Sequence, residues 1–459
     1  MTAPIARTAL RVDGVRLLDV LARLAEIGAD PAGGVSRLGL SAEENEGRAF
    51  LRELARDAGL VTETDAAGNL FVRRPGGRPE APVLLMGSHL DSVRQGGRLD
   101  GAYGVVAAVE VLRVFASATP WLELPYEPVV VAFANEEGAL VQYPFWGSRA
   151  LSGQLADGLS ARDRAGRSVR AYLLAAGGDP ERLDAAAWAP GRIGAFLELH
   201  IEQGPVLERR GVQIGVVDGI VGRTIFDAEV AGQVQHAGTT PMPDRRDALA
   251  AAADVVLGVR RIAATERLCS TATVGYLDVS PNVTNTVPGT VRLSAEVRDT
   301  DPERIARAEA AVREVCAEVE KTTGCRVTVT VAARSRPVST DPLLRRAIAE
   351  AAEELGLTRL TMPSGAGHDA QMVAEIAPVG MIFVPSRDGI SHAPAEDTAP
   401  EALVCGADVL LQAALRVQEL VTAVEFGPAA FGPAELDPTE LDPARTGRHP
   451  TTTDDGGGR

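Results

Sequence analysis

The segment GSHLDSVRQGGRLD, residues 87–100, constrains the fold of this chain more than any other part of the sequence. It follows an apolar run at residues 82–86 that is typical of a buried strand. His89, Asp91 and Asp100 therefore lie at the carboxyl end of a strand or just past it, where open α/β sheets hold their ligands. A histidine near carboxylates can begin a metal site, although an ordinary polar loop is the alternative for this segment alone.

Strands and helices alternate through most of the chain, which predicts an α/β fold with a mostly parallel sheet covered on both faces. Ser41 and Glu44 form a predicted capping box within the first helical segment. The expected elements are helical segments within residues 14–60, a hairpin of strands 61–63 and 70–73, strand 82–88, helix 102–116, strand 128–134, helical stretches to about 187, strand 193–200, helix 341–355, strand 358–362, helix 369–377, strand 379–384 and helix 402–423.

A second pattern interrupts the first. Its order is β-α-β-β-α-β, the split βαβ arrangement of ferredoxin-like domains. The strands are expected at 219–231, 271–279, 289–299 and 325–333, and the helices at 246–266 and 301–323. The predicted organisation is a catalytic domain in two parts, 1–211 and 334–425, an inserted α+β domain, 212–333, and a tail, 426–459, whose composition predicts disorder.

Composition narrows the class of protein. The 459 residues suffice for roughly two domains, and no apolar run reaches the ~20 residues that a membrane span requires. A net charge of −16 argues against nucleic acid as a partner. The four cysteines have no CxxC spacing, and the amino-terminal residues lack the apolar core of a secretory signal, so a reduced cytoplasmic location is expected.

The run PVVVAFA, residues 128–134, leads through one asparagine into Glu136 and Glu137. Two adjacent carboxylates at a strand end are costly unless a positive charge lies beside them. A divalent metal would supply that charge, with one carboxylate as a ligand and its neighbour free to act as a base. A solvated acidic loop is the alternative for this motif alone.

Three of the six histidines follow apolar strands. Besides His89, the run 193–199 ends at His200, and the run 379–384 leads into a loop that contains His392. Nitrogen and oxygen ligands without a thiolate suit Zn²⁺, Mn²⁺, Co²⁺ or Ni²⁺. If Asp100 bridges two ions, the site is a two-metal hydrolase centre.

These segments together resemble the M20 metallopeptidase superfamily and, within it, the hydantoinase/carbamoylase subgroup. The resemblance covers about residues 15–423. It rests on the motifs GSHLDSV, GGRLDGAYGVV, FANEEG, LELHIEQGPVLE, QHAGTTPMPDRRDAL, NTVPGTVRLSAEVRD, SGAGHDA and SHAPAED. The resemblance implies two divalent ions per subunit and makes the inserted domain a dimerisation lid, so that the protein would be a homodimer.

The resemblance also assigns roles by matching position. His89 and His392 would be terminal ligands, Asp100 would bridge the ions, and Glu137 and His200 would complete the ligand sets. Glu136 would be the general base, and Asp91 would orient His89 from behind.

The predicted substrate-facing residues are spread over both domains. His236 is suited to stabilise an oxyanion, because a neutral imidazole can donate a hydrogen bond, and Arg298 could hold a carboxylate with two parallel hydrogen bonds. A packing histidine and a plain surface arginine are the alternatives. By resemblance Arg298 anchors the substrate carboxylate, Gln203 and Asn285 take its polar groups, and His236, Asn285 and Arg298 reach the partner subunit's site or close over it. Gly365 and Gly367 would allow close backbone approach to a ligand. His368, which follows Gly367, is expected to be structural or to support a ligand from behind rather than to bind the metal.

The function that follows is a metal-dependent amidohydrolase that cleaves the linear C–N bond of a small ureido acid, as an N-carbamoyl-L-amino acid hydrolase does. Allantoate amidohydrolase and β-ureidopropionase are alternatives that the sequence does not separate from it. An aminoacylase or dipeptidase is a further enzymatic alternative. A metal-free binding protein with a decayed site is the alternative from another class, and intact ligands at every matched position argue against it.

Overall fold

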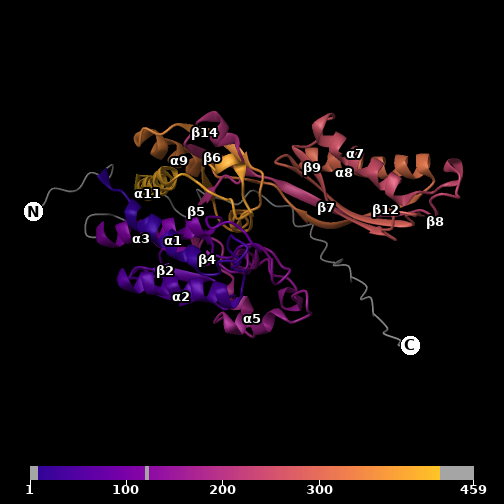
Figure 1. Cartoon of the computed structure of the whole chain (residues 1–459). Coiled ribbons are helices and arrows are strands. Elements are labelled where there is room, and N and C mark those ends of the chain that lie inside the picture. The colour runs from indigo at the N-terminus through magenta and orange to yellow at the C-terminus, as the bar shows by residue number, and fades with distance from the viewer. Residues whose placement is uncertain (1–8, 119–123, 424–459) are drawn as a thin grey trace, which may run out of the picture. The chain divides into compact units, whose positions relative to one another are not determined.

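The computed structural model describes residues 9–118 and 124–423 (Figure 1). These residues form two compact units: unit 1 runs up to Val221 and resumes at Pro337, and unit 2 is Gly222–Arg336. The tail predicted at 426–459 lies outside the described residues. No helix among the described residues is both long and apolar enough to cross a membrane.

Unit 1 is built on a nine-stranded sheet with the order β1-β2-β4-β3-β5-β15-β6-β13, and β14 pairs with β6. The central strands β4, β3, β5 and β15 run parallel. Every residue of β3, β4 and β15 is buried, as expected for parallel strands covered on both faces. The strands are β1 (Val61–Thr64), β2 (Leu70–Arg73), β3 (Val83–His89), β4 (Glu127–Phe133), β5 (Ile193–Ile201), β6 (Ile214–Ile220), β13 (Val338–Ser339), β14 (Arg359–Ser364) and β15 (Val379–Val384).

The helical segment predicted over 14–60 is two helices separated by a loop at 27–41 that contains four glycines. Ser41 caps the second helix by accepting the backbone N–H of Glu44 at 3.2 Å, whereas the Glu44 carboxylate accepts from Leu40. The stretch predicted as helical up to 187 contains only short helices. The helices of unit 1 are α1 (Gly14–Glu26), α2 (Ala42–Asp57), α3 (Ala102–Ala118), α4 (Trp146–Leu151), α5 (Val169–Ala175), α6 (Val206–Arg210), α9 (Pro342–Glu354), α10 (Asp369–Val373) and α11 (Pro400–Ala423).

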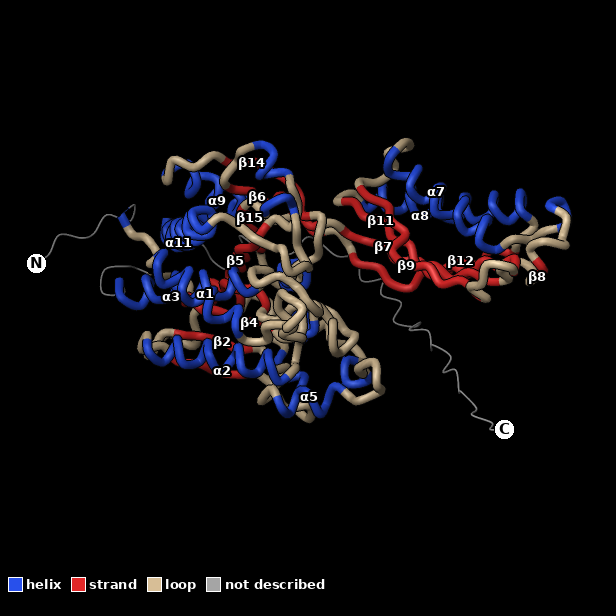
Figure 2. The backbone as a smooth tube through the Cα atoms, in the orientation of Figure 1, coloured by secondary structure: helices blue, strands red, loops and turns tan. Residues whose placement is uncertain are grey.

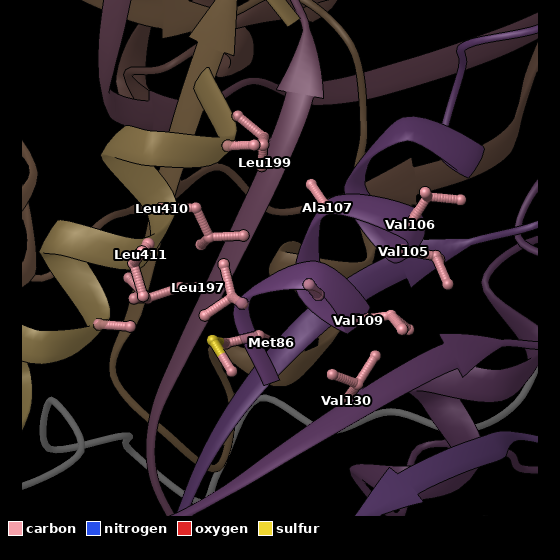
Figure 3. Packing of buried hydrophobic residues seen from close by; sticks show 14 of the residues in the cluster. Met86, Val105, Val106, Ala107, Val109, Val130, Leu197, Leu199, Leu410 and Leu411 are labelled. Atoms are coloured by element: carbon pink, nitrogen blue, oxygen red, sulfur yellow. The ribbon is translucent and has the colours of Figure 1, made fainter. Parts of the chain in front are cut away.

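The main core lies between the central strands and the long helices (Figure 3). Met86 of β3 and Leu197 of β5 are fully buried there with Val109 of α3 and Leu410 of α11. Burying a side chain of this kind contributes about 1.5–3 kcal/mol. This packing holds the carboxyl ends of the strands at fixed separations.

Unit 2 contains a four-stranded antiparallel sheet with the order β12-β7-β11-β9. Two helices cover one face of this sheet, and among the described residues no helix of unit 2 covers the other face (Figure 2). The elements are β7 (Gly222–Ala231), α7 (Ala248–Ala264), β9 (Thr271–Ser280), β11 (Thr290–Asp299), α8 (Pro302–Thr323) and β12 (Arg326–Ser335), with a small ladder of β8 (Gln235–His236) and β10 (Thr286–Val287).

The border between the units lies later than the sequence predicts. The single strand expected at 219–231 is the end of β6, which pairs with β14 and β15 in unit 1, followed by β7 of unit 2. The chain therefore leaves unit 1 after Val221 and returns at Pro337, not at the predicted 212 and 334. The β-rich sequence continues through the junction without a polar linker, so no change of composition marks the passage from one sheet to the other.

Candidate metal centre

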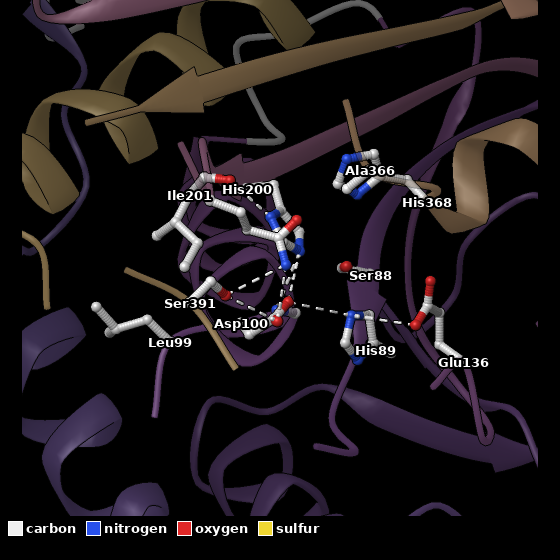
Figure 4. Close-up of polar contacts among 12 residues, drawn as sticks. Ser88, His89, Leu99, Asp100, Glu136, His200, Ile201, Ala366, His368 and Ser391 are labelled. Atoms are coloured by element: carbon white, nitrogen blue, oxygen red, sulfur yellow. Dashed lines mark hydrogen bonds and ion pairs between the residues drawn. The ribbon is translucent and has the colours of Figure 1, made fainter. Parts of the chain in front are cut away.

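The predicted ligands of unit 1 lie together at the carboxyl ends of its parallel strands. Figure 4 shows three of them, His89, Asp100 and His200. His89 is the last residue of β3, and His200 is the penultimate residue of β5. Glu137 follows β4, and His392 lies in the loop between β15 and α11. Neighbouring parallel strands end at the same edge of a sheet, so segments far apart in the sequence deliver these side chains to one place.

The ligands form two clusters that share one carboxylate. The ligand atoms of His89, Asp100 and His200 all lie within 4.8 Å of one another, and those of Asp100, Glu137 and His392 do the same. Oδ1 of Asp100 lies 3.0 Å from Nε2 of His200 and 3.7 Å from Nε2 of His89. Oδ2 of Asp100 lies 3.0 Å from Nε2 of His392. Each oxygen of the shared carboxylate therefore faces one cluster.

The two strand histidines direct their Nε2 atoms at these carboxylates. His89 Nδ1 lies 2.9 Å from the backbone carbonyl of Asp91, and His200 Nδ1 lies 2.8 Å from the carbonyl of Ile201. A carbonyl only accepts hydrogen bonds, so these contacts place a ring proton on Nδ1 and leave Nε2 as the atom that would bind a metal. Burial opposes protonation, but the surrounding carboxylates raise the pKa of both rings. Without a metal Nε2 therefore also carries a proton, and a divalent cation would take the place of that proton. In a neutral ring, the Nε2 lone pair and the Asp100 carboxylate oxygens are all acceptors, so they cannot hydrogen-bond to one another. This donor set fits a divalent cation between them.

The second cluster also needs a positive charge beside its carboxylates. Hydrogen bonding to Asp100 and then to Glu137 raises the pKa of His392 to about 11. Glu137 Oε1 is buried and lies 3.2 Å from His392 Nε2, and among the described residues it has no other polar partner. Without a metal, a proton on His392 must balance the carboxylates. A divalent ion would provide that charge in its place, so these residues also fit a metal.

Glu136 lies beside the clusters without belonging to either of them. Its Oε2 is 3.9 Å from Nε2 of His89, and its side chain is 8% exposed. Burial raises the pKa of Glu136 well above its ordinary value, with Glu137 adding to the shift and His89 opposing it. A poorly solvated carboxyl group at this position is suited to exchanging a proton with a bound substrate or water.

Asp91 orients both glutamates. Its two oxygens accept the backbone N–H groups of Glu136 and Glu137 at 3.0 and 3.1 Å. The carboxylate itself lies 3.7 Å from Nδ1 of His89, so the direct hydrogen bond that fixes this ring goes to the backbone carbonyl of Asp91.

Two backbone positions explain how the loops reach this arrangement. Asn135 adopts a left-handed φ of 49°, a region that asparagine tolerates, and its side chain donates to the carbonyls of Val141 and Tyr143. This turns the chain out of β4 and fixes the loop that follows Glu137. Gly101 has a φ of 62°, and a Cβ there would lie 2.4 Å from the ring of His89, so only glycine fits.

The other predicted residues of unit 1 lie around this centre. Gln203 donates from Nε2 to Oδ2 of Asp100 at 2.9 Å, so its side chain contacts the shared carboxylate. Gly365 has open space where a Cβ would be, whereas a Cβ on Gly367 would lie 2.9 Å from the ring of Phe145. His368 hydrogen-bonds with the Ser364 hydroxyl at 2.8 Å, and its ring centroid lies 4.7 Å from that of His200.

Two of the three predicted residues of unit 2 lie side by side, and the third lies at the other end of the sheet. His236 lies in β8 and pairs with Thr286, which places it next to Asn285, whose carbonyl accepts the N–H of Ala237. His236 follows the Ala231 end of β7, and Asn285 lies shortly before Thr290, which pairs with Ala231. Arg298 pairs with Arg223 at the opposite end of the sheet.

Arg298 lies eight positions after Thr290 on β11, which corresponds to roughly 26 Å at a rise of about 3.3 Å per residue. Two hydrogen bonds from the Arg298 guanidinium, at 2.9 and 3.0 Å, go to Glu296. The exposed His236 accepts the N–H groups of Gly238 and Thr239 at Nδ1, which places the proton of the neutral ring on Nε2.

Three functional positions escaped the sequence-based prediction. Glu198 is fully buried within β5 and accepts from Ser88 and Ala370, behind the first cluster. Ser391 and Glu396 flank His392 and contact the Asp100 segment. The available signals were a carboxylate within an apolar strand and the first acid after the histidine of SHAPAED.

The fold and the site together define the class of metal-dependent α/β hydrolases. Residues 85–416 match the model of Peptidase family M20/M25/M40, and the chain belongs to this family. It is 40% identical over 400 residues to an N-carbamoyl-L-amino acid amidohydrolase of Geobacillus stearothermophilus, covering 87% of this chain and 97% of the relative. It is 34% identical over 402 residues to an allantoate amidohydrolase of Bacillus subtilis, covering 86% and 95%.

A solved structure of an amidase of the hydantoinase/carbamoylase family from Burkholderia multivorans has the same fold. It superimposes with a TM-score of 0.80 at 38% sequence identity and covers 89% of this chain and 98% of that one.

Proposed function

We propose that this protein is an N-carbamoyl-L-amino acid amidohydrolase that uses two divalent metal ions. The observation that carries the proposal is the pair of ligand clusters that share Asp100, with Glu136 beside them. The Geobacillus relative supports the choice of substrate. The Bacillus allantoate amidohydrolase keeps a second ureido acid, allantoate, as the alternative, and β-ureidopropionate is a further one.

Each residue has a task in this proposal. His89, His200 and Asp100 would hold one ion, and Asp100, Glu137 and His392 the other. Two such ions would supply positive charge that polarises the ureido carbonyl and makes water a better nucleophile. Glu136 would take the proton from the attacking water and deliver it to the nitrogen that leaves when the C–N bond breaks. Hydrolysis of one C–N bond would leave a carbamic acid, and its spontaneous decarboxylation would complete the products, which are the amino acid, ammonia and CO₂.

The substrate contacts of unit 2 form the finer part of the proposal. The Nε2 proton of His236 would donate to the oxyanion, and Arg298 would bind the substrate carboxylate after exchanging Glu296 for it. Because roughly 26 Å separates the two ends of this sheet, His236 and Arg298 of one chain would not reach the same small molecule. We therefore propose a homodimer in which the partner's copy of unit 2 completes the site.

Exposed apolar side chains support unit 2 as the dimer interface. Leu257 on α7 is 60% exposed, and Tyr276 and Leu277 on β9 are 57% and 41% exposed. β9 is an edge strand, so its outer backbone groups have no partner within this sheet.

A cytoplasmic location belongs to the same proposal, supported by the four free thiols.

A substrate panel tests the proposal. The metal-loaded protein is incubated with N-carbamoyl-L-amino acids, N-carbamoyl-β-alanine, allantoate and N-acetyl-amino acids, and both ammonia and free amine are measured. Carbamoyl amino acids are expected to give the highest kcat/KM. A clear preference for allantoate would move the assignment to the alternative. Amine released from acetyl amino acids without activity on any ureido acid would refute it.

A further inference from the structure

A buried carboxylate outside both ligand clusters links the two segments that form the second one. Glu396 lies four residues after His392 and is 3% exposed. It lies so close to the chain before Asp100 that a Cβ on Gly97 would be 1.9 Å from its Cδ. Glycine at 97 therefore leaves the space that the Glu396 carboxylate occupies.

The hydrogen bonds of Glu396 reach both segments. Its Oε1 accepts the backbone N–H groups of Leu99 at 2.9 Å and of Asp100 at 3.1 Å. Its Oε2 accepts the hydroxyl of Ser391 at 2.8 Å. That hydroxyl lies 3.3 Å from Oδ2 of Asp100 (Figure 4). One side chain thus fixes the residue next to His392 and the backbone of the shared ligand.

His392 needs such support more than the other histidines do. His89 and His200 are held by strands of the buried sheet, whereas His392 lies in a loop and its side chain is 49% exposed. Its φ of 56° lies in the left-handed region, which is strained for a non-glycine residue and persists only where the surroundings impose it.

We propose that Glu396 is a positioning residue for the second metal ion: it fixes the separation between Asp100 and His392 and so sets the affinity of the Asp100–Glu137–His392 cluster. The inference rests on the proposed two-ion function. It assigns no contact between Glu396 and the metal or the substrate.

The test is a titration of metal-free protein with Co²⁺, in which calorimetry measures affinity and the cobalt absorption spectrum reports coordination. Wild type is expected to bind two ions. Glu396→Ala is expected to bind the first ion normally and the second about 10–100-fold more weakly, the usual cost of losing support behind a ligand. Excess Co²⁺ should restore most of its kcat on a ureido acid, because the ligands themselves are intact.

Asp397→Ala is the matched control. Asp397 joins the same two segments through Arg98, at 2.8 Å, but at the surface, where an ion pair contributes little to stability. Both of its ion affinities should stay near those of wild type. Glu396→Gln keeps the shape and the acceptor for Leu99 and Asp100, so its second-ion affinity should lie between those of wild type and Glu396→Ala.

Three outcomes would overturn the inference. A second-ion affinity of Glu396→Ala equal to that of wild type would do so, as would equal weakening of both ions, which would indicate a general structural defect. If Glu396→Ala does not fold, a second-ion affinity of Glu396→Gln equal to that of wild type would also overturn the inference. Wild type that binds fewer than two ions would instead contradict the proposed function itself.

Discussion

The two units of this protein arrange their predicted site residues in opposite ways. In unit 1, segments up to about 300 positions apart deliver His89, Asp100 and His392 to one edge of a sheet. In unit 2, Asn285 lies five residues before Thr290, which begins β11, and Arg298 lies at the other end of that strand. Parallel strands gather distant residues because their carboxyl ends align, whereas a long antiparallel strand separates residues that are close in sequence.

The largest expected effect concerns unit 1, where the site would be complete within one chain. Glu136→Gln keeps the size of the side chain but removes the base, so kcat should fall by about 10²–10⁴ while metal content stays near that of wild type. Ammonia release and elemental analysis measure the two quantities on the same sample.

Glu137→Gln is the matched control for that change. It should lose metal from the second cluster, because Glu137 lies 3.2 Å from His392 and Glu136 belongs to neither cluster. Metal loss in Glu136→Gln together with full metal content in Glu137→Gln would reverse the two assignments.

The same contrast decides what the sequence could predict. Apolar runs that end in His89 and His200, and a run followed by Glu136 and Glu137, predicted the clustered ligands, because strand ends of one parallel sheet must meet. The junction at Val221 could not be predicted, since β6 and β7 form one continuous β-rich stretch that two different sheets share.

Contacts between loops were also beyond the sequence. The hydrogen bonds of Glu396 to Leu99 and Asp100 join segments whose separation no local pattern specifies. The pairing of Arg298 with Glu296 was within reach, because side chains two residues apart point to the same face of a strand.

A second expected effect tests whether unit 2 acts across a dimer. Leu257→Glu combined with Tyr276→Glu places charges on the exposed apolar surface of α7 and β9 and should give a monomer. Its kcat should fall by about 10²–10³, the usual loss when an oxyanion donor is removed, because His236 could no longer reach the partner's metal centre.

Leu174→Glu is the control for the added charge, because Leu174 is 62% exposed on α5 of unit 1. It should leave mass and activity unchanged. Light scattering that finds the doubly substituted chain monomeric and fully active would eliminate the role of a partner subunit.

The smallest expected effect concerns Arg298. Arg298→Lys removes the fork that binds a carboxylate, so kcat/KM for a ureido acid should fall by about 10–100-fold, corresponding to roughly 1.5–3 kcal/mol. The loss should shrink on the matching ureido amide, which has no carboxylate to bind. Arg292→Lys, on the same strand and paired with Glu229 at 3.1 Å, is the control and should change neither substrate. Equal losses on acid and amide would make Arg298 a structural residue of β11.

The shared carboxylate is the centre of the account, and counting ions tests it most directly. Metal-free protein should release no ammonia from a carbamoyl amino acid. Activity should return as Mn²⁺, Co²⁺, Ni²⁺ or Zn²⁺ is added and should level off at two ions per chain. Asp100→Asn should hold neither ion firmly and stay inactive, because both clusters lose the same ligand. Full activity in verified metal-free protein, or two tightly bound ions in Asp100→Asn, would contradict the account.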